Sequence, residues 1–316
     1  MSVLDDSMLL YRVAKYYYEN EYSQEEISKI EHISRAQISR LLKKAKDSKI
    51  VKIEVVIPDS QSVYELSERL KKYLNIKNVI ISPSVEKQKD NDENLYSVAS
   101  SYLSKNLIKY KNIGIGWGKT LYNISLQLLN YEDESDLVFC PLVGNSGTEN
   151  PHLQTNSITD RFSERFKGRA FYSNLLMLEK RDDISEISFT RLAKLKEMWN
   201  NLDVAVIGLG GETTSNKHLY VDELPEVFYN NEDINHIIGD VLGDFYMNDG
   251  TLLQFPSEYE KISITSEQLK NIHNVICIAH GEQKVRAIEH ISREKFINTL
   301  ITDEYTARMI LDKFQI

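Results

Sequence analysis

One segment, residues 112–121 (Asn-Ile-Gly-Ile-Gly-Trp-Gly-Lys-Thr-Leu), constrains the fold of this chain more than any other. Ile113 and Ile115 are β-branched and predict a buried strand, and the alternating glycines allow the backbone to turn sharply. The turn leads into a helical pattern over residues 120–129. A strand, a glycine turn and a helix start make an anion site, because the N–H groups and the dipole of the first helical turn favour negative charge.

The spacing of these glycines excludes two nucleotide-binding motifs. A Walker A loop requires glycine at the position held by Ile113. A dinucleotide fingerprint that begins at Gly114 requires glycine at the position held by Lys119. An anion site of another kind and a purely structural strand-to-helix turn both remain open.

After residue 78 the sequence alternates between short apolar runs and helical spacings. The expected strands are 79–81, 113–115, 137–144, 171–178, 204–211, 275–279 and 298–302, and the expected helices are 94–110, 120–129, 155–166 and a last one from residue 304. This alternation predicts an α/β fold, a parallel sheet with helices on both faces. Ligands of such sheets bind at the carboxyl ends of the strands. The rim near residues 117–120 is therefore expected to carry Asn145, Gly208, His280, Lys284 and Asp303.

The first 57 residues predict a small all-α domain. A helix over residues 8–18 precedes the segment 23–26 (Ser-Gln-Glu-Glu), a capping box that starts a second helix. After a short turn, Ser34 is placed to cap a third helix over residues 35–46. Two short helices joined by a tight turn, the second rich in basic and amide side chains, predict a helix-turn-helix.

The distribution of charge supports a DNA contact at the third helix. The window 33–52 holds seven basic residues and one acidic residue, whereas the whole chain has a formal net charge of −9. Arginine and glutamine can read guanine and adenine edges, and lysines suit phosphates. The expected DNA-binding residues are Ser34, Arg35, Gln37, Ser39, Arg40, Lys43 and Lys44. A basic helix that is merely solvated is the alternative.

A joint separates this domain from the rest of the chain. Residues 49–57 alternate like a strand that ends at Pro58, and a polar stretch then leads into a helix. The apolar stripe of that helix can pack on the next domain or pair with another subunit. We therefore expect a helix-turn-helix domain at 1–57, a linker helix at 58–77 and a ligand-binding domain at 78–316.

Composition limits the class of protein. With 41% hydrophobic residues over 316 positions, the chain can form ordinary globular cores for about two domains. No run of 18 apolar residues occurs, and Asp5 and Asp6 stand where a signal peptide would be basic, so we expect a cytoplasmic protein with no membrane partner. Cys140 and Cys277 match no metal motif and are expected to be buried. Neither a metal nor a cofactor is expected.

In their order and spacing, several segments resemble the SorC family of bacterial transcriptional regulators, over nearly all of residues 10–311. The segments that carry the resemblance are Tyr-Ser-Gln-Glu-Glu-Ile at 22–27, Ile-Ser-Arg at 33–35, Ile-Ser-Arg-Leu-Leu at 38–42, Gly-Ile-Gly-Trp-Gly-Lys-Thr-Leu at 114–121, Pro-Leu-Val-Gly at 141–144, Gly-Asp-Val-Leu-Gly-Asp-Phe-Tyr at 239–246, Lys284 with Ala-Ile at 287–288, Leu-Ile-Thr-Asp-Glu at 300–304, and Thr-Ala at 306–307.

The resemblance implies an effector domain similar to glucosamine-6-phosphate deaminase and ribose-5-phosphate isomerase, and a tetramer, most simply a dimer of dimers. It also implies a phosphorylated sugar or polyol as the effector of a carbohydrate-utilisation operon. Carried over by position, residues 116–120 hold the phosphate, Lys284 reaches a phosphate and Asp240 binds sugar hydroxyls. The effector-binding residues implied are Gly116, Trp117, Gly118, Lys119, Thr120, Asn145, Gln154, Asp240 and Lys284.

This chain departs from the family pattern at residues 279–282 (Ala-His-Gly-Glu), where two adjacent glycines are common. The departure concerns the contacts near Lys284. Two of the acidic positions also have a second interpretation. Asp240 and Asp303 can be structural caps as readily as ligand contacts.

The same kinship raises an enzyme as the alternative function. Sugar-phosphate isomerases need a positioned acid and base, but His152, His218 and His236 are scattered in polar segments without a local cluster. We therefore expect no catalytic residues. The expected function is that of a regulator, a repressor, whose affinity for operator DNA is linked to effector binding. A sugar-phosphate sensor that acts on a protein partner is a third alternative.

Overall fold

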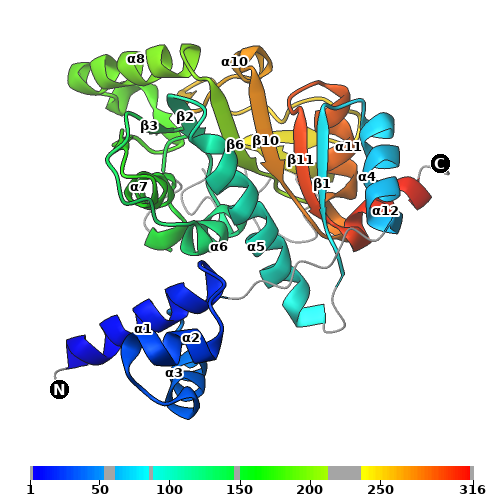
Figure 1. The fold of residues 1–316 in the computed structure, drawn as a ribbon. Helices are drawn as coiled ribbons and strands as arrows, with labels where there is room; N and C mark the ends of the chain where they lie inside the picture. Colours follow the sequence, from blue (N-terminus) through cyan, green and yellow to red (C-terminus); the bar gives the residue numbers. More distant parts are fainter. Residues whose placement is uncertain (1–2, 53–60, 85–87, 146–149, 213–235, 314–316) are drawn as a thin grey trace. The chain divides into compact units, whose positions relative to one another are not determined.

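The computed structural model describes residues 3–52, 61–84, 88–145, 150–212 and 236–313. Contacts divide the chain into two compact units, residues 1–60 and residues 61–316 (Figure 1). Within the described ranges, none of the helices combines the length and hydropathy that crossing a bilayer requires.

The first unit contains three helices, α1 (Val3–Tyr18), α2 (Gln24–Glu31) and α3 (Arg35–Asp47). All three helices contribute apolar side chains to its interior, with α3 in contact with both of the others. The buried apolar residues of the unit are Leu10, Val13, Ala14, Ile27, Ile38, Leu42 and Ala45.

Both α2 and α3 begin at a capping box. Ser23 Oγ accepts a hydrogen bond from the Glu26 N–H at 3.3 Å, and the Ser23 N–H donates to Glu26 Oε2 at 2.8 Å. Ser34 and Gln37 repeat this arrangement at the start of α3. His32, with φ of 55°, ends α2 in the left-handed region, so that residues 32–34 alone connect the two helices.

The strand expected at 49–57 is wrong over residues 49–52. Residues 49–52 form a turn and a bend. Lys49 has a φ of 60°, and the Val51 N–H donates to the Ala45 carbonyl at 3.0 Å, so this backbone ends α3 instead of pairing in a sheet. Residues 53–57 lie outside the described residues.

The second unit is built on a seven-stranded sheet. In spatial order its strands are β1 (Asn78–Ser82), β11 (Thr299–Asp303), β10 (Asn274–Ile278), β6 (Val204–Gly208), β2 (Asn112–Ile115), β3 (Val138–Pro141) and β4 (Arg169–Ala170). Every neighbouring pair in this order runs parallel. The predicted α/β fold, preceded by a helical region, is confirmed.

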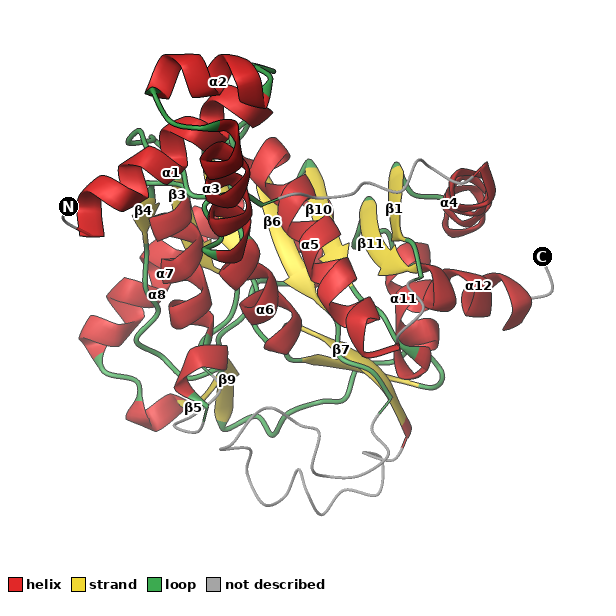
Figure 2. Ribbon diagram, turned by 60° about the horizontal axis from the view of Figure 1, so that its bottom comes forward, coloured by secondary structure: helices red, strands yellow, loops and turns green. Residues whose placement is uncertain are grey.

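Helices cover both faces of the sheet (Figures 1 and 2). One face carries α5 (Gln88–Leu107), α6 (Lys119–Gln127) and α7 (Thr155–Arg165), and the other carries α4 (Gln61–Leu74), α8 (Glu186–Asn200), α10 (Ser266–Asn271), α11 (Val285–Arg293) and α12 (Glu304–Lys313). Alternate residues of β6 pack into opposite layers, Val204 and Val206 into the first and Ala205 and Ile207 into the second. A strand buried on both sides is apolar throughout, which explains the continuous apolar runs in the sequence.

The apolar stripe of α4 packs on its own α/β unit. Leu66, Leu70 and Leu74 are buried in the same cluster as the neighbouring helices. The helix contacts β1, α11 and α12. Of the two roles left open by the sequence, this stripe therefore serves the first, packing on the following domain.

The strand expected at 171–178 is wrong. β4 ends at Ala170, because the side chain of Asn156 forms hydrogen bonds with both the N–H and the carbonyl of Ser173 and takes that backbone away from the sheet edge. The chain enters a strand again only at β5 (Leu178–Lys180), which pairs antiparallel with β9 (Tyr259–Lys261).

The strand expected at 204–211 ends early, at Gly208. Beyond it the chain leaves the sheet, and the Gly210 N–H donates to the Asp240 carbonyl at 2.9 Å. Asp240 belongs to a hairpin that the sequence patterns did not predict. This hairpin consists of β7 (Ile237–Val241) and β8 (Asp244–Met247). Leu242 and Gly243 both have positive φ, which is the requirement of a tight two-residue turn.

Candidate functional site

The predicted anion loop connects β2 to α6 at the carboxyl edge of the sheet. The Gly116 N–H donates to the Val206 carbonyl at 2.9 Å and fixes the start of the loop on β6. Gly118, the N-cap of α6, has a φ of 101° and provides no side chain to cap the helix. A Cβ built on Gly118 would meet no heavy atom within 4 Å, and the neighbouring Lys119 is exposed. The loop thus borders open space instead of being sealed beneath other side chains.

The strand order places this loop at the point where the direction of winding reverses. From β2 the chain continues outward to β3 and β4, whereas β6, β10 and β11 lie on the other side of β2. A crevice forms at the carboxyl ends of two such diverging strands, and it is where ligands of doubly wound sheets bind. Here the diverging strands are β2 and β6.

A second group of charged side chains lies along the same edge. His280 follows β10, Asp303 ends β11, and Lys284 ends the short 3-10 turn Glu282–Lys284 that precedes α11. His280 Nδ1 lies 3.5 Å from Asp92 Oδ1 and 4.0 Å from Asp303 Oδ2. The structure therefore brings together the predicted rim residues of β10 and β11.

Burial and neighbouring charges shift the pKa values of Lys284 and His280. Burial lowers the pKa of the Lys284 ammonium, and the charges of Asp240 and Asp92 oppose that shift. Burial likewise lowers the pKa of His280, helped by Lys284 and Lys119 and opposed by Asp92 and Asp303. These shifts place Lys119, His280 and Lys284 within one electrostatic environment.

Asp92 is a member of this group that the sequence interpretation missed. It lies in the first turns of α5, the helix that follows β1. A helix that follows a parallel strand begins at the carboxyl edge of the sheet, so its first turns were candidates for the rim. That topological signal, and not a motif, would have identified Asp92.

Asp303 also has a structural role. Its Oδ1 accepts a hydrogen bond from the Thr306 N–H at 2.8 Å, which caps the start of α12. Thr306 Oγ1 in turn accepts from the Gly281 N–H at 2.7 Å. The cap therefore connects the loop after β10 to the end of β11.

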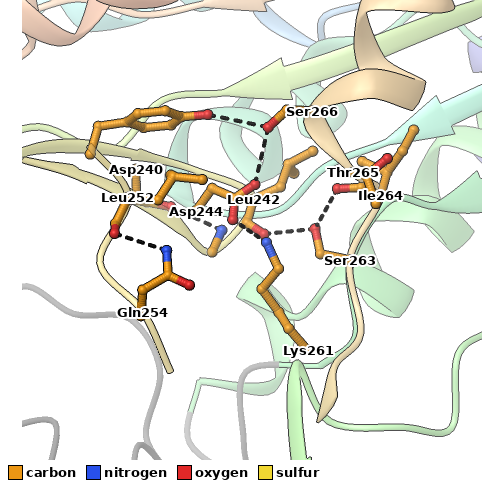
Figure 3. Close-up of polar contacts among 12 residues, drawn as sticks. Asp240, Leu242, Asp244, Leu252, Gln254, Lys261, Ser263, Ile264, Thr265 and Ser266 are labelled. Carbon is orange, nitrogen blue, oxygen red and sulfur yellow. Dashed lines mark hydrogen bonds and ion pairs between the residues drawn. The ribbon is translucent and has the colours of Figure 1, made fainter. Parts of the chain in front are cut away.

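Asp240 lies in the β7–β8 hairpin, whose turn is anchored by several polar contacts (Figure 3). Its Oδ2 accepts from the Gly243 N–H at 3.4 Å, while Ser263 Oγ donates to the Leu242 carbonyl at 2.8 Å and Lys261 pairs with Asp244. Burial raises the pKa of Asp240 to about 6, against the effects of the Gly243 hydrogen bond and Lys284. Asp240 thus combines a turn contact with an electrostatic connection to the rim.

Asn145 and Gln154 lie at the end of β3 and the start of α7. Asn145 donates from Nδ2 to the Ser173 carbonyl at 3.1 Å, but its buried Oδ1 has no partner among the described residues. Gln154 is 8% exposed and precedes Thr155, whose buried Oγ1 also lacks a partner within the described part. Because buried polar oxygens are normally satisfied, these atoms indicate a polar environment that the described residues do not supply.

The predicted DNA-binding residues all lie on the accessible side of α3 and its N-cap. The side chains of Ile38, Leu42 and Ala45 are buried against the other helices. The exposed positions are Ser34, Arg35, Gln37, Ser39, Arg40, Lys43 and Lys44. Gln37 is partly engaged, since its Oε1 accepts from both the N–H and the hydroxyl of Ser34.

Other candidate sites are weaker. Cys140 and Cys277 are free and buried, as predicted, and burial raises the pKa of each thiol to about 12. The described residues contain no group of three His, Cys, Asp or Glu side chains placed to hold a metal. His236 lies against Asn248 near the hairpin and His152 against Tyr122, whereas His218 lies outside the described residues.

Comparison with known proteins extends these observations. A family model described as "Putative sugar-binding domain" matches residues 59–312. The sorbitol operon regulator of Klebsiella pneumoniae is 25% identical over 319 residues, covering 97% of this chain and 98% of the relative. The deoxyribonucleoside regulator of Bacillus subtilis (strain 168) is 24% identical and covers 98% of both chains.

The crystal structure of the full-length sorbitol operon regulator SorC from Klebsiella pneumoniae has the same fold. It superposes with a TM-score of 0.78 at 24% identity, covering 97% of this chain and 99% of that chain. Each of these relatives is named as a regulator and none as an enzyme. The chain therefore belongs to the SorC family of sugar-binding transcriptional regulators.

Proposed function

We propose that this regulator binds operator DNA through α3 and is controlled by a phosphorylated sugar or polyol at the carboxyl edge of the sheet. The observation that carries the proposal is the open anion loop at 116–120, with exposed Lys119, which shares its electrostatic environment with Lys284 across the β2–β6 crevice. A helix N-terminus combined with two ammonium groups suits a phosphate dianion. A neutral sugar would leave the positive charge of the site without a counter-charge.

Within this site the residues have distinct proposed roles. The backbone N–H groups of Trp117 and Gly118 and the side chains of Lys119 and Thr120 hold the phosphoryl group, and Lys284 provides a second cation. Gly116 contributes by shaping the loop, because its own N–H is bonded to the Val206 carbonyl. Three further residues bind the hydroxyl groups of the effector, and they are Asn145, Gln154 and Asp240. Asn145 Oδ1, which has no partner within the described ranges, supports this role, because a hydroxyl donor would satisfy it.

DNA binding is assigned to the exposed side of α3. Arg35 and Arg40 read bases in the major groove, Ser39 adds a hydroxyl, and Lys43 and Lys44 contact phosphates. Ser34 and Gln37 contribute less freely because they form the capping box of the same helix. Gln37 therefore offers only its Nε2 donors to DNA.

A partly buried polar contact offers a route between the two activities. Tyr73 of α4 donates a hydrogen bond to Glu289 of α11 at 2.6 Å, and Glu289 also pairs with Arg293. α4 begins at the boundary of the two units, and α11 begins next to Lys284. A shift of α11 on effector binding would therefore change the packing of α4. This helix is the first element after the DNA-binding unit in the chain.

We further propose that the regulator is a repressor and a dimer of dimers. The core and caps of the first unit come from its own residues, so its α3 needs no effector to be built, and effector binding can act by lowering DNA affinity. Helix-turn-helix proteins generally read two half-sites with two subunits. Size measurements with and without operator DNA test this assembly.

A thermal-shift screen tests the proposed effector class. Sugar and polyol phosphates are compared with their unphosphorylated parents at equal concentration. A ligand present at about 100 times its dissociation constant stabilises the folded state by about 2.7 kcal/mol. We expect stabilisation by a phosphorylated compound only; stabilisation by the parent sugar alone would contradict the phosphate assignment.

A further inference from the structure

His280 has the most unusual surroundings of the residues at the rim. Its side chain is only 16% exposed. The charged groups that act on it come from four elements. They are Asp92 of α5, Asp303 of β11, Lys284 before α11 and Lys119 of α6.

The imidazole ring turns one of its nitrogens toward two carboxylates. Nδ1 faces the carboxylates of Asp92 and Asp303, at 3.5 and 4.0 Å, and the ring of Tyr96 lies edge-on at 6.1 Å between centroids. The following residue, Gly281, is fixed by its hydrogen bond to Thr306. With Nδ1 turned to carboxylates, Nε2 is the nitrogen left for a ligand.

The groups around His280 favour different protonation states of its ring. Two carboxylates favour the imidazolium, whereas burial and the two ammonium groups disfavour it, so that its pKa is lowered in the protein itself. A phosphate dianion beside Lys119 and Lys284 would offset both ammonium charges. The carboxylates would then determine the protonation state of the ring.

We propose that His280 is a further effector-binding residue, which contacts the phosphoryl group through Nε2 as an imidazolium held by Asp92 and Asp303. The proton that Nε2 carries is taken from solvent when the phosphate binds. This inference rests on the proposed function, because it requires a phosphorylated effector at the loop 116–120.

The sign of the pH dependence follows from linkage. A group whose pKa is low in the free protein and higher in the complex takes up protons on binding at pH values between the two. Affinity for the dianion therefore rises as the pH falls through this window. Above the pKa of the complex, the contribution of His280 is lost.

Calorimetric titration of the full chain measures this proton directly. Binding enthalpies of sorbitol 6-phosphate are measured at about pH 7.5, where a phosphomonoester is largely a dianion and brings almost no proton of its own. Buffers that differ in ionisation enthalpy are used, with sorbitol as the uncharged control. We expect proton uptake with the phosphorylated ligand, and a smaller uptake with His280→Gln.

Two more variants separate the binding role from a structural one. His273→Gln removes an exposed histidine at the opposite end of β10 and should keep the full uptake. Asp92→Asn should reduce it, because one of the two carboxylates that favour the imidazolium is lost. Asp92 is 57% exposed, so this variant keeps the fold even if His280→Gln does not.

Each outcome decides a specific claim. Phosphate binding without proton uptake, or equal uptake in His280→Gln and the unmodified protein, would overturn the role of His280 and leave the proposed function standing. Failure of every phosphorylated compound to bind would overturn both.

Discussion

The two units of this protein form their functional surfaces in opposite ways. In the first unit the surface assigned to DNA is one side of a single helix, α3, set by two capping boxes and a core of a few side chains. In the second unit the rim is assembled from five elements separated by up to about two hundred residues in the chain, for instance Asp92 beside His280. Local signals therefore specify the first surface, and topology specifies the second.

Mutations should therefore affect the two surfaces differently. The small core of the first unit gives it little stability to lose, so a single cavity should unfold it. The second unit has a large core on both faces of its sheet, so loss of a rim contact should change ligand affinity without unfolding. Four substitutions, in decreasing order of the change in free energy that we expect, test whether the two units differ in this way.

Ile38→Ala should abolish DNA binding by unfolding the first unit. Ile38 is fully buried, and removing such a side chain costs about 2–5 kcal/mol. Helix content by circular dichroism and operator binding should fall, while the thermal shift by a sugar phosphate persists. Ile30→Ala, at a position 44% exposed on α2, is the matched control. Loss of effector binding in Ile38→Ala would show that the units do not fold independently.

Thr120→Ala should weaken effector binding without changing operator affinity. A hydrogen bond to a charged group contributes about 1.5–3 kcal/mol, which corresponds to roughly 10- to 150-fold in the dissociation constant. Calorimetry measures the change, with Thr190→Ala on the exposed surface of α8 as control. Unchanged affinity for every phosphorylated ligand would contradict the anion-loop assignment.

Arg40→Ala should weaken operator binding by about 1–3 kcal/mol and relax specificity at one base position. Lys29→Ala removes an exposed positive charge from α2 in the same unit and should have a smaller effect. Fluorescence anisotropy at fixed salt concentration measures both, since DNA affinities depend strongly on salt. Equal effects of the two variants would argue for a charged surface without a recognition helix.

Tyr73→Phe should have the smallest effect, on the coupling between the activities. It removes the hydrogen bond to Glu289, worth about 0.5–1.5 kcal/mol, while Arg293 still pairs with that carboxylate. The ratio of operator affinities with and without effector should move toward one. Tyr64→Phe, 61% exposed on the same helix, is the control. An unchanged ratio would remove the α4–α11 contact from the mechanism.

The sequence predicts the two units unequally well. The capping residues Ser23 and Ser34 predict the starts of α2 and α3, because capping acts within four residues. Continuous apolar runs predict the central strands, because a strand that is buried on both faces of the sheet is apolar throughout. The strand expected at 171–178 fails because Asn156, a distant side chain, competes for its backbone.

Likewise, the sequence predicts only part of the rim. The loop 116–120 is visible in the sequence because its glycines are adjacent to its strand and helix. Asp92 belongs to no motif: topology alone places the start of its helix at the rim, and nothing near it in the sequence indicates that His280 lies beside it. The hairpin that holds Asp240 is equally hidden, because its tight turn is Leu242-Gly243 and lacks the usual asparagine or aspartate.

The central claim is that one bound phosphate changes how tightly the protein holds DNA. The most direct measurement is operator affinity at constant salt, with and without a saturating sugar phosphate, in the unmodified chain and in Thr120→Ala. We predict that the effector weakens operator binding by about 5- to 150-fold in the unmodified chain, and that Thr120→Ala loses this response while binding DNA normally. Equal operator affinity in both conditions, with the effector demonstrably bound, would contradict the account.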